Sequence, residues 1–148
     1  MNAVEKSLYE NGVYTGKTQG DSMEPMLKEG RDTVIIVSPK FPLKKYDVPV
    51  YRRDDHITMH RIIKCTKKGY IICGDNRSYL EKDIKDSDII GVLSGFYHNG
   101  RYVDVKDKAY IKYARKIKRK IYLRIVKKYI RVVWRKLLFN ELFRLMNL

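Results

Sequence analysis

The chain has 148 residues and a net charge of +15, and 44% of its residues are hydrophobic. This length suits one domain with a buried core and is too short for two ordinary domains. No run of about 18 apolar residues occurs, so we expect no transmembrane helix, and the charged first ten residues are unlike a signal peptide. Residues 1–105 carry 17 Lys or Arg against 15 Asp or Glu, whereas residues 106–148 carry 15 against 2. We therefore expect a nearly neutral cytoplasmic body followed by a strongly basic tail.

The first third of the chain contains three predicted elements. Residues 1–11 are expected to form a short helix that ends at Asn11-Gly12, and residues 13–18 suit a strand because they contain Val, Tyr and Thr. Ser22 is a plausible N-cap of a second short helix that Gly30 would close. These elements lead the chain into its most distinctive turn.

The middle of the chain is rich in β-branched residues. Residues 33–37 predict a buried strand, and residues 47–51 predict a second one, in which Pro49 indicates an edge position or a bulge. Residues 56–65 and 69–73 predict a hairpin. If Lys67-Lys68 form its turn, Cys65 lies opposite Tyr70 and Cys73 lies opposite Ile62. The two cysteines then do not face each other across the hairpin.

The two thiols lack the spacing of a disulfide framework or a zinc site, so we expect both to stay reduced and the protein to need no metal or cofactor. Residues 77–88 are polar and predict an irregular segment. Residues 88–96 and 101–105 predict a last hairpin. About seven short strands with one helical turn indicate a mainly β domain over residues 1–105, with a coiled, barrel-like sheet.

Ser22 is the first candidate functional residue. It lies on a turn between Gly20 and Pro25, and a nucleophilic serine must project from such a sharp turn, where its own backbone N–H can help to stabilise an oxyanion. Met23 and Met26 are expected to anchor the turn on the core. The alternative is that Ser22 only caps a short helix.

His60 and a nearby acid are the other candidates. A histidine held on a strand titrates near neutral pH, as a general base must, although it could instead only bond a neighbouring loop. The hairpin register brings Asp75 near His60, where the acid could orient the base or merely stabilise its own turn. Glu81 and Asp83 are the reserve acids.

Three segments, with a looser match at a fourth, resemble the S24/S26 serine peptidase superfamily, which includes signal peptidase I and the LexA-type self-cleaving repressors. Residues 20–32, which begin Gly-Asp-Ser-Met-Glu-Pro-Met, resemble the serine box of this family. Residues 46–50 loosely match its Gly-Asp-Val-Val strand. His60-Arg61-Ile62 and Gly74-Asp75-Asn76 resemble its last two boxes, so that the resemblance covers residues 13–97.

The resemblance implies a signal-peptidase-like serine endopeptidase that cleaves a peptide or leader. Ser22 would be the nucleophile, and Asp75 or Glu81 would orient the base. That base would be His60, where most bacterial members have a lysine. Lys64 is a weaker alternative base, because it lies about 13 Å further along the strand.

Two departures from the family pattern matter. No transmembrane anchor precedes the serine box, and the 21 residues before Ser22 contain neither an Ala-Gly nor a Cys-Gly bond, so self-cleavage of the LexA type is not expected. Asp21, next to the nucleophile, would oppose a developing oxyanion. The alternative function is a catalytically inactive binding protein whose tail binds membrane or nucleic acid.

The tail, residues 106–148, predicts a long basic amphipathic helix, because apolar residues recur mostly at spacings of three and four. The apolar stripe contains Ala114, Ile117, Ile121, Ile125, Tyr129, Val132, Val133, Leu137 and Leu142. Such a helix favours an anionic membrane surface, which would place the protein on the inner face of the cell membrane. Nucleic-acid binding is less favoured, and a helix docked on the body is the third alternative. Basic residues through its middle argue against a membrane span.

Overall fold

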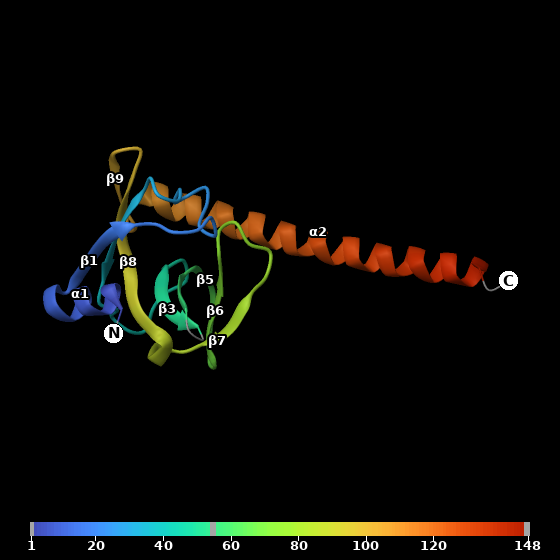
Figure 1. The fold of residues 1–148 in the computed structure, drawn as a ribbon, viewed down its shortest axis with the longest axis horizontal. Helices are drawn as coiled ribbons and strands as arrows, with labels where there is room; N and C mark the ends of the chain where they lie inside the picture. Colours follow the sequence, from blue (N-terminus) through green and yellow to red (C-terminus); the bar gives the residue numbers. More distant parts are fainter. Residues whose placement is uncertain (1, 54–55, 147–148) are drawn as a thin grey trace.

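The computed structural model describes residues 2–53 and 56–146. A short N-terminal helix and two curled β-sheets form the body, and a long C-terminal helix leaves the body as a rod (Figure 1). The helices are α1 (Ala3–Asn11), the 3-10 helix η1 (Asp86–Asp88) and α2 (Lys108–Met146). The predicted mainly β, barrel-like fold with a long C-terminal helix is confirmed.

The large sheet is antiparallel and runs in the order β1-β2-β8-β3-β4, with β9 paired to β8. Its strands are β1 (Val13–Lys17), β2 (Thr33–Val37), β3 (Pro49–Arg53), β4 (His56–Met59), β8 (Ile89–His98) and β9 (Arg101–Asp104). Register shifts in the β2–β8 and β3–β8 pairings bend the strands, as bulges do, and the sheet curls into a half-barrel. Strand β3 lies between β8 and β4, so the predicted edge position is wrong, whereas the predicted irregularity near Pro49 is present.

The small sheet contains β5 (Arg61–Thr66), β6 (Gly69–Cys73) and β7 (Glu81–Ile84). The β5–β6 hairpin is confirmed, and Cys65 lies opposite Tyr70 as predicted. A register shift between Ile62 and Lys64 moves the far end of the pairing by one residue, so Cys73 lies opposite Arg61 and not opposite Ile62. Both thiols are free. The segment predicted to be irregular instead forms β7 and η1.

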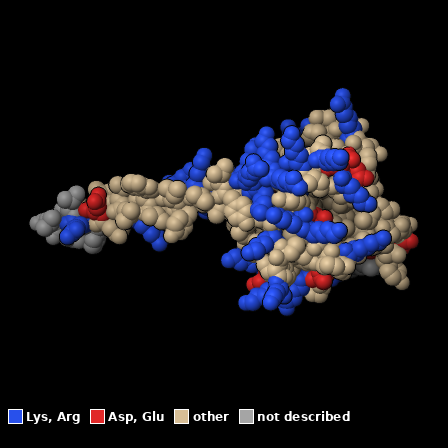
Figure 2. Space-filling model, turned by 180° about the vertical axis from the view of Figure 1, so that it is seen from behind, with Lys and Arg blue, Asp and Glu red and all other residues tan. Residues whose placement is uncertain are grey.

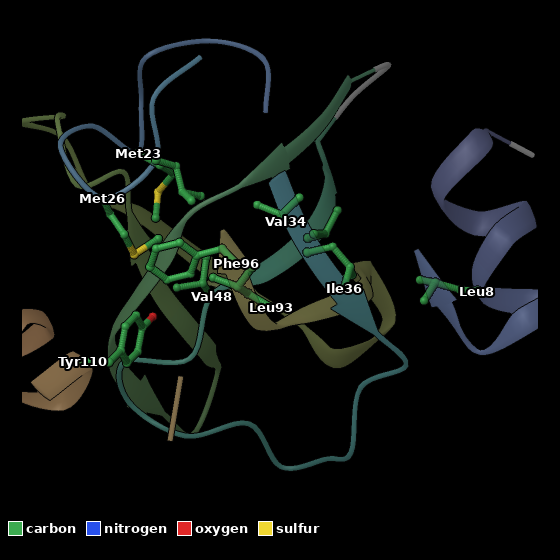
Figure 3. Close-up of a cluster of buried hydrophobic side chains, with 11 residues drawn as sticks. Leu8, Met23, Met26, Val34, Ile36, Val48, Leu93, Phe96 and Tyr110 are labelled. Atoms are coloured by element: carbon green, nitrogen blue, oxygen red, sulfur yellow. The ribbon is translucent and has the colours of Figure 1, made fainter. Parts of the chain in front are cut away.

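The serine turn, residues 18–30, is packed on the core of the large sheet. Met23 and Met26 are each 4% exposed and belong to the same buried cluster as Phe96 and Tyr110 (Figure 3). The predicted helix after Ser22 does not form, because the segment runs through successive turns. Hydrogen bonds from the Gly30 amide to the Thr18 carbonyl and from the Thr18 hydroxyl to the Lys28 carbonyl close the loop instead.

Both terminal helices begin as the sequence predicts, but they differ in how much of them is covered. Helix α1 has a capping box between Asn2 and Glu5, and Gly12 ends it in a left-handed conformation. The first turns of α2 pack on the body through buried Tyr110, Ala114, Ile117 and Ile121. Beyond Ile121, no described side chain of α2 is buried. Within the described residues, no helix has both the length and the apolar character needed to cross a membrane.

Candidate active site

His60 lies at the junction of the two sheets. The strand predicted over residues 56–65 is interrupted at His60, because the residues before it pair with β3 in the large sheet and those after it pair with β6 in the small one. The imidazole is buried, with 4% of the residue exposed. This position gives His60 neighbours from both sheets.

One edge of the imidazole faces an acid and a phenol. The Nδ1 atom of His60 is 2.7 Å from Glu81 Oε1 and 3.0 Å from the Tyr51 hydroxyl. A carboxylate accepts hydrogen bonds only, so Nδ1 carries the proton and donates it to Glu81. The proton on Nδ1 leaves Nε2 of a neutral imidazole as an acceptor.

Glu81 stays ionised in this setting. Burial alone would raise its pKa, but hydrogen bonds from His60, Arg53 and Tyr51 outweigh burial and lower the pKa of Glu81 to about 2. Burial and the Glu81 charge raise the pKa of the Tyr51 hydroxyl, which therefore remains protonated. The acid behind the imidazole is thus a carboxylate held by three donors.

Asp75 occupies a different position. Its two carboxylate oxygens accept hydrogen bonds from Nε and Nη2 of Arg61, each at 2.7 Å, and both side chains are 0% exposed. The shifted register explains this placement: with Cys73 opposite Arg61, the next residue along, Gly74, lies beside His60. Of the two acids that the sequence left open, Glu81 is the one that contacts the histidine.

Gly74 is in close contact with both His60 and Ser22. A Cβ atom at Gly74 would lie 2.8 Å from the Ser22 carbonyl oxygen and 3.1 Å from Cδ2 of His60, so both residues pack directly against this glycine. The Asn76 amide also donates to the Ser22 carbonyl, at 2.8 Å. Cδ2 and Nε2 are adjacent ring atoms, and they lie across the ring from the edge that meets Glu81. The imidazole therefore presents its Nδ1 edge to Glu81 and its opposite edge to the side where Ser22 lies.

Asp21, the residue before the serine, is paired with an arginine. Its carboxylate pairs with Arg77 at 2.5 Å, and this hydrogen bond lowers the pKa of Asp21. The negative charge that the sequence places beside Ser22 is therefore balanced by a guanidinium. The other two candidates, Lys64 and Asp83, have exposed side chains.

Ser22 is one of the residues that line a groove of about 400 Å³. It is lined by the start of α1, by the serine turn and by four strands of the large sheet. The strand residues are Tyr14, Lys17, Val34, Ile36, Val50, Ile57, Thr58 and Met59. Strands β1 and β4, the two ends of the main strand path, both contribute, so the curl of the sheet brings its two edges to one groove.

Two contributors to the site were not predicted from the sequence. Tyr51 and Arg53 lie two residues apart on β3, so their side chains leave the same face of the strand, and both contact the His60–Glu81 pair. The sequence signal that could have identified them is their spacing of two residues on the strand that pairs with β4, which ends directly before His60. Among the described residues, no group of three His, Cys, Asp or Glu side chains is placed to hold a metal ion.

Comparison with known families agrees with this fold. The profile of the family described as Peptidase S24-like matches residues 3–94, which include the groove, the serine turn, His60 and Glu81. No curated protein matches the chain. The family match spans more than half of the chain, and the body therefore has the fold of a serine-type peptidase. The chain belongs to the Peptidase S24-like family.

Proposed function

We propose that the protein is a serine endopeptidase of the signal-peptidase-like type. Ser22 is its nucleophile, His60 its general base and Glu81 the acid that orients the base. The observation that carries the proposal is the placement of His60, which has Glu81 on its Nδ1 edge and Gly74, packed against Ser22, on its opposite edge. Asp75 supports the loop around Gly74 through Arg61.

The reaction follows from the protonation states. Nε2 of His60 accepts the Ser22 hydroxyl proton as Oγ attacks the scissile carbonyl, and the imidazolium that forms is stabilised by Glu81. The same proton passes to the leaving amine when the peptide bond breaks, which leaves an acyl-enzyme. Water then attacks the ester, His60 accepts its proton, and the serine is regenerated. The Ser22 backbone N–H is a donor for the oxyanion.

An extended peptide is the substrate that suits the groove. Among the strands that the structure describes, β1 and β4 each pair on one side only, and both contribute residues to this groove. An added strand can pair with such an edge. Met23, Leu27 and Ile36 line the groove together with Ser22, and Met23 follows the serine directly in the chain, so apolar substrate side chains are favoured. A cleavable leader or precursor segment has both properties.

Covalent labelling tests the nucleophile. A fluorophosphonate should label the wild-type chain, and Ser22→Ala should abolish the label without changing the unfolding transition. The matched control is Ser87→Ala, which removes an exposed hydroxyl from η1, away from the groove, and should label like the wild type. His60→Ala should also lose labelling, because the hydroxyl then has no base.

Two outcomes would overturn the proposal. One is equal labelling of Ser22→Ala and wild type. The other is a folded wild-type chain that binds an apolar extended peptide in the groove but never labels or cleaves it, which would assign the protein to the binding class.

A further inference from the structure

We propose that the distal half of α2, residues 122–137, binds an anionic lipid surface through the side of the helix that faces away from the body. The basis is a change of character along one helix. From Tyr110 to Ile121 the body covers one side of α2, whereas from Tyr122 onward every described side chain is at least partly exposed. Near the start of this part, Ile125 still packs against the buried cluster that contains Ile117 and Ile121. Figure 1 shows the helix beyond it as an isolated rod.

The exposed rod carries large apolar side chains. Val126 is 52% exposed, Tyr129 70%, Trp134 61% and Leu137 55%. An isolated helix gains its stability mainly by packing an apolar face, and a contiguous exposed apolar surface marks an interaction site. The face therefore needs a partner that the body does not provide.

The two sides of the helix exchange character at about Ile121. At about 3.6 residues per turn, the buried side of the first half continues as Ile125, Lys128, Val132 and Arg135, with Arg124 and Arg131 at its margin, so that basic residues enter a side that is apolar in the first half. The side that faces away from the body begins with Arg115 and Arg119. It continues with Tyr122, Val126, Ile130, Val133 and Leu137. The single apolar stripe predicted from the sequence is thus buried in its first part only, and the distal apolar side points away from the body.

The positive charge of α2 favours one class of partner. Residues 106–148 contain 15 Lys or Arg and 2 Asp or Glu, and Figure 2 shows basic side chains gathered around the base of the rod. Pairing with a second copy of this helix would cover the apolar side, but it would bring together two helices that each carry a large excess of positive charge and would leave the basic side without a partner. Nucleic acid would use the basic side and leave the apolar side uncovered. An anionic lipid surface uses both, because apolar side chains enter the interface and basic ones meet the headgroups.

The orientation is compatible with a bound body. Because the distal apolar side points away from the body, lipid on that side does not meet the sheets. Lys136 lies among the apolar residues, and its long side chain can extend to the headgroups. Arg124, at the start of the rod, donates to the Asp75 carbonyl, so the helix leaves the body beside the loop that holds Ser22.

Trp134 is the only tryptophan in the chain and reports directly on this contact. The test adds vesicles of phosphatidylcholine mixed with phosphatidylglycerol, or of phosphatidylcholine alone, to the full chain. We expect a blue shift of Trp134 emission and co-sedimentation with the mixed vesicles only. Ile130→Gln with Leu137→Gln should weaken binding at least about tenfold, because two apolar side chains no longer enter the interface.

Charge variants complete the design. Lys128→Gln with Arg135→Gln should weaken binding about tenfold and reduce its salt dependence. The matched control, Lys82→Gln with Lys85→Gln, removes the same charge from exposed positions of the body and should bind like the wild type. The test does not depend on the chemistry at Ser22, so a Ser22→Ala chain should bind equally well.

Four results would overturn the proposal. They are equal binding to neutral vesicles, unchanged binding by the Ile130 and Leu137 variant, a concentration-dependent dimer that shifts Trp134 emission without lipid, and binding to a short DNA duplex in place of vesicles. Failure of serine labelling would leave lipid binding untouched, which keeps the two proposals separable.

Discussion

His60 and Arg61 are neighbours in the chain, and each places its side chain against a buried carboxylate. Arg61 donates to both oxygens of Asp75, and its remaining donors meet the Tyr110 hydroxyl and Met26. His60 meets Glu81 with one edge only, and its other edge faces Gly74. The first pair has no capacity left for a substrate, whereas the second keeps one ring nitrogen for a proton. Two similar pairs therefore suit different roles: the first a structural one, and the second the chemical one that we propose.

Consecutive residues reach such different surroundings because the chain changes sheet between them. His60 ends the run that pairs with β3, and Arg61 begins β5. The guanidinium enters the space between the serine turn and α2, where it also lies over the rings of Tyr110 and Tyr113. Arg61 thus connects three segments of the core, and His60 lies where the two sheets meet, directly after Met59, which lines the groove.

The largest expected effect is on stability, from removal of the structural pair. Arg61→Ala leaves Asp75 as an uncompensated buried charge, and it should lower the free energy of unfolding by about 3–5 kcal/mol, measured by urea denaturation. Arg61→Met with Asp75→Leu removes both charges and should lose clearly less. A single variant as stable as the wild type would show that the pair does not support the fold.

Removal of the Glu81 carboxylate should lower the rate of serine labelling. Glu81→Gln keeps the shape but takes away the charge that stabilises the imidazolium, so the rate of serine labelling should fall about 10²–10⁴-fold. The unfolding free energy should change less than in Arg61→Ala, because Arg53 on the outer side of Glu81 is half exposed. Labelling at the wild-type rate would assign the orienting role elsewhere, and Asp75→Asn would then be the variant to compare.

Acid should unfold the protein partly through Glu81. The folded-state pKa of this carboxyl is lowered to about 2 from 4.5, so its contribution to stability is complete above about pH 4.5 and is lost as the pH falls toward 2. Thermal unfolding should be followed from about pH 6 to about pH 2. The thermal midpoint should fall less steeply with pH in Glu81→Gln than in the wild type. Parallel curves would contradict the hydrogen-bonded carboxylate.

The smallest effect is expected at the exposed pair beside the serine. Asp21→Asn removes a carboxylate that already pairs with Arg77 at the surface, and such pairs contribute little to stability. The thermal midpoint should stay unchanged, and the labelling rate should change little. A large rate increase would mean that the Asp21 charge acts on the oxyanion despite Arg77.

Much of the body could be predicted from local signals. The β-branched run at residues 33–37 and the Asn11-Gly12 helix end are each found where the sequence places them. The residue opposite Cys73 could not be predicted from local signals. The register shift between Ile62 and Lys64 arises from the pairing of the strands and not from any turn residue. That one-residue shift also decides which residue lies beside His60.

Strand β7 explains why the acid could not be chosen from the sequence. Its first three residues, Glu-Lys-Asp, have low β-propensity, yet the segment pairs with β6, and Glu81 and Ile84 are buried. Tertiary pairing thus overrides the local preference. Glu81 was only a reserve candidate for the same reason, since a polar loop gives no indication that one of its carboxylates points inward.

In the proposed mechanism, substrate recognition and proton transfer use residues of different sheets. Apart from the serine turn and the start of α1, the groove is lined by strands of the large sheet, whereas Glu81 belongs to β7 of the small sheet. The surface that would select a peptide and the carboxylate that would orient the base in this mechanism therefore belong to separate sheets, with His60 at their junction. Substitutions along the groove can change which peptide fits and leave the alignment of the imidazole intact, so that specificity and reactivity can evolve independently.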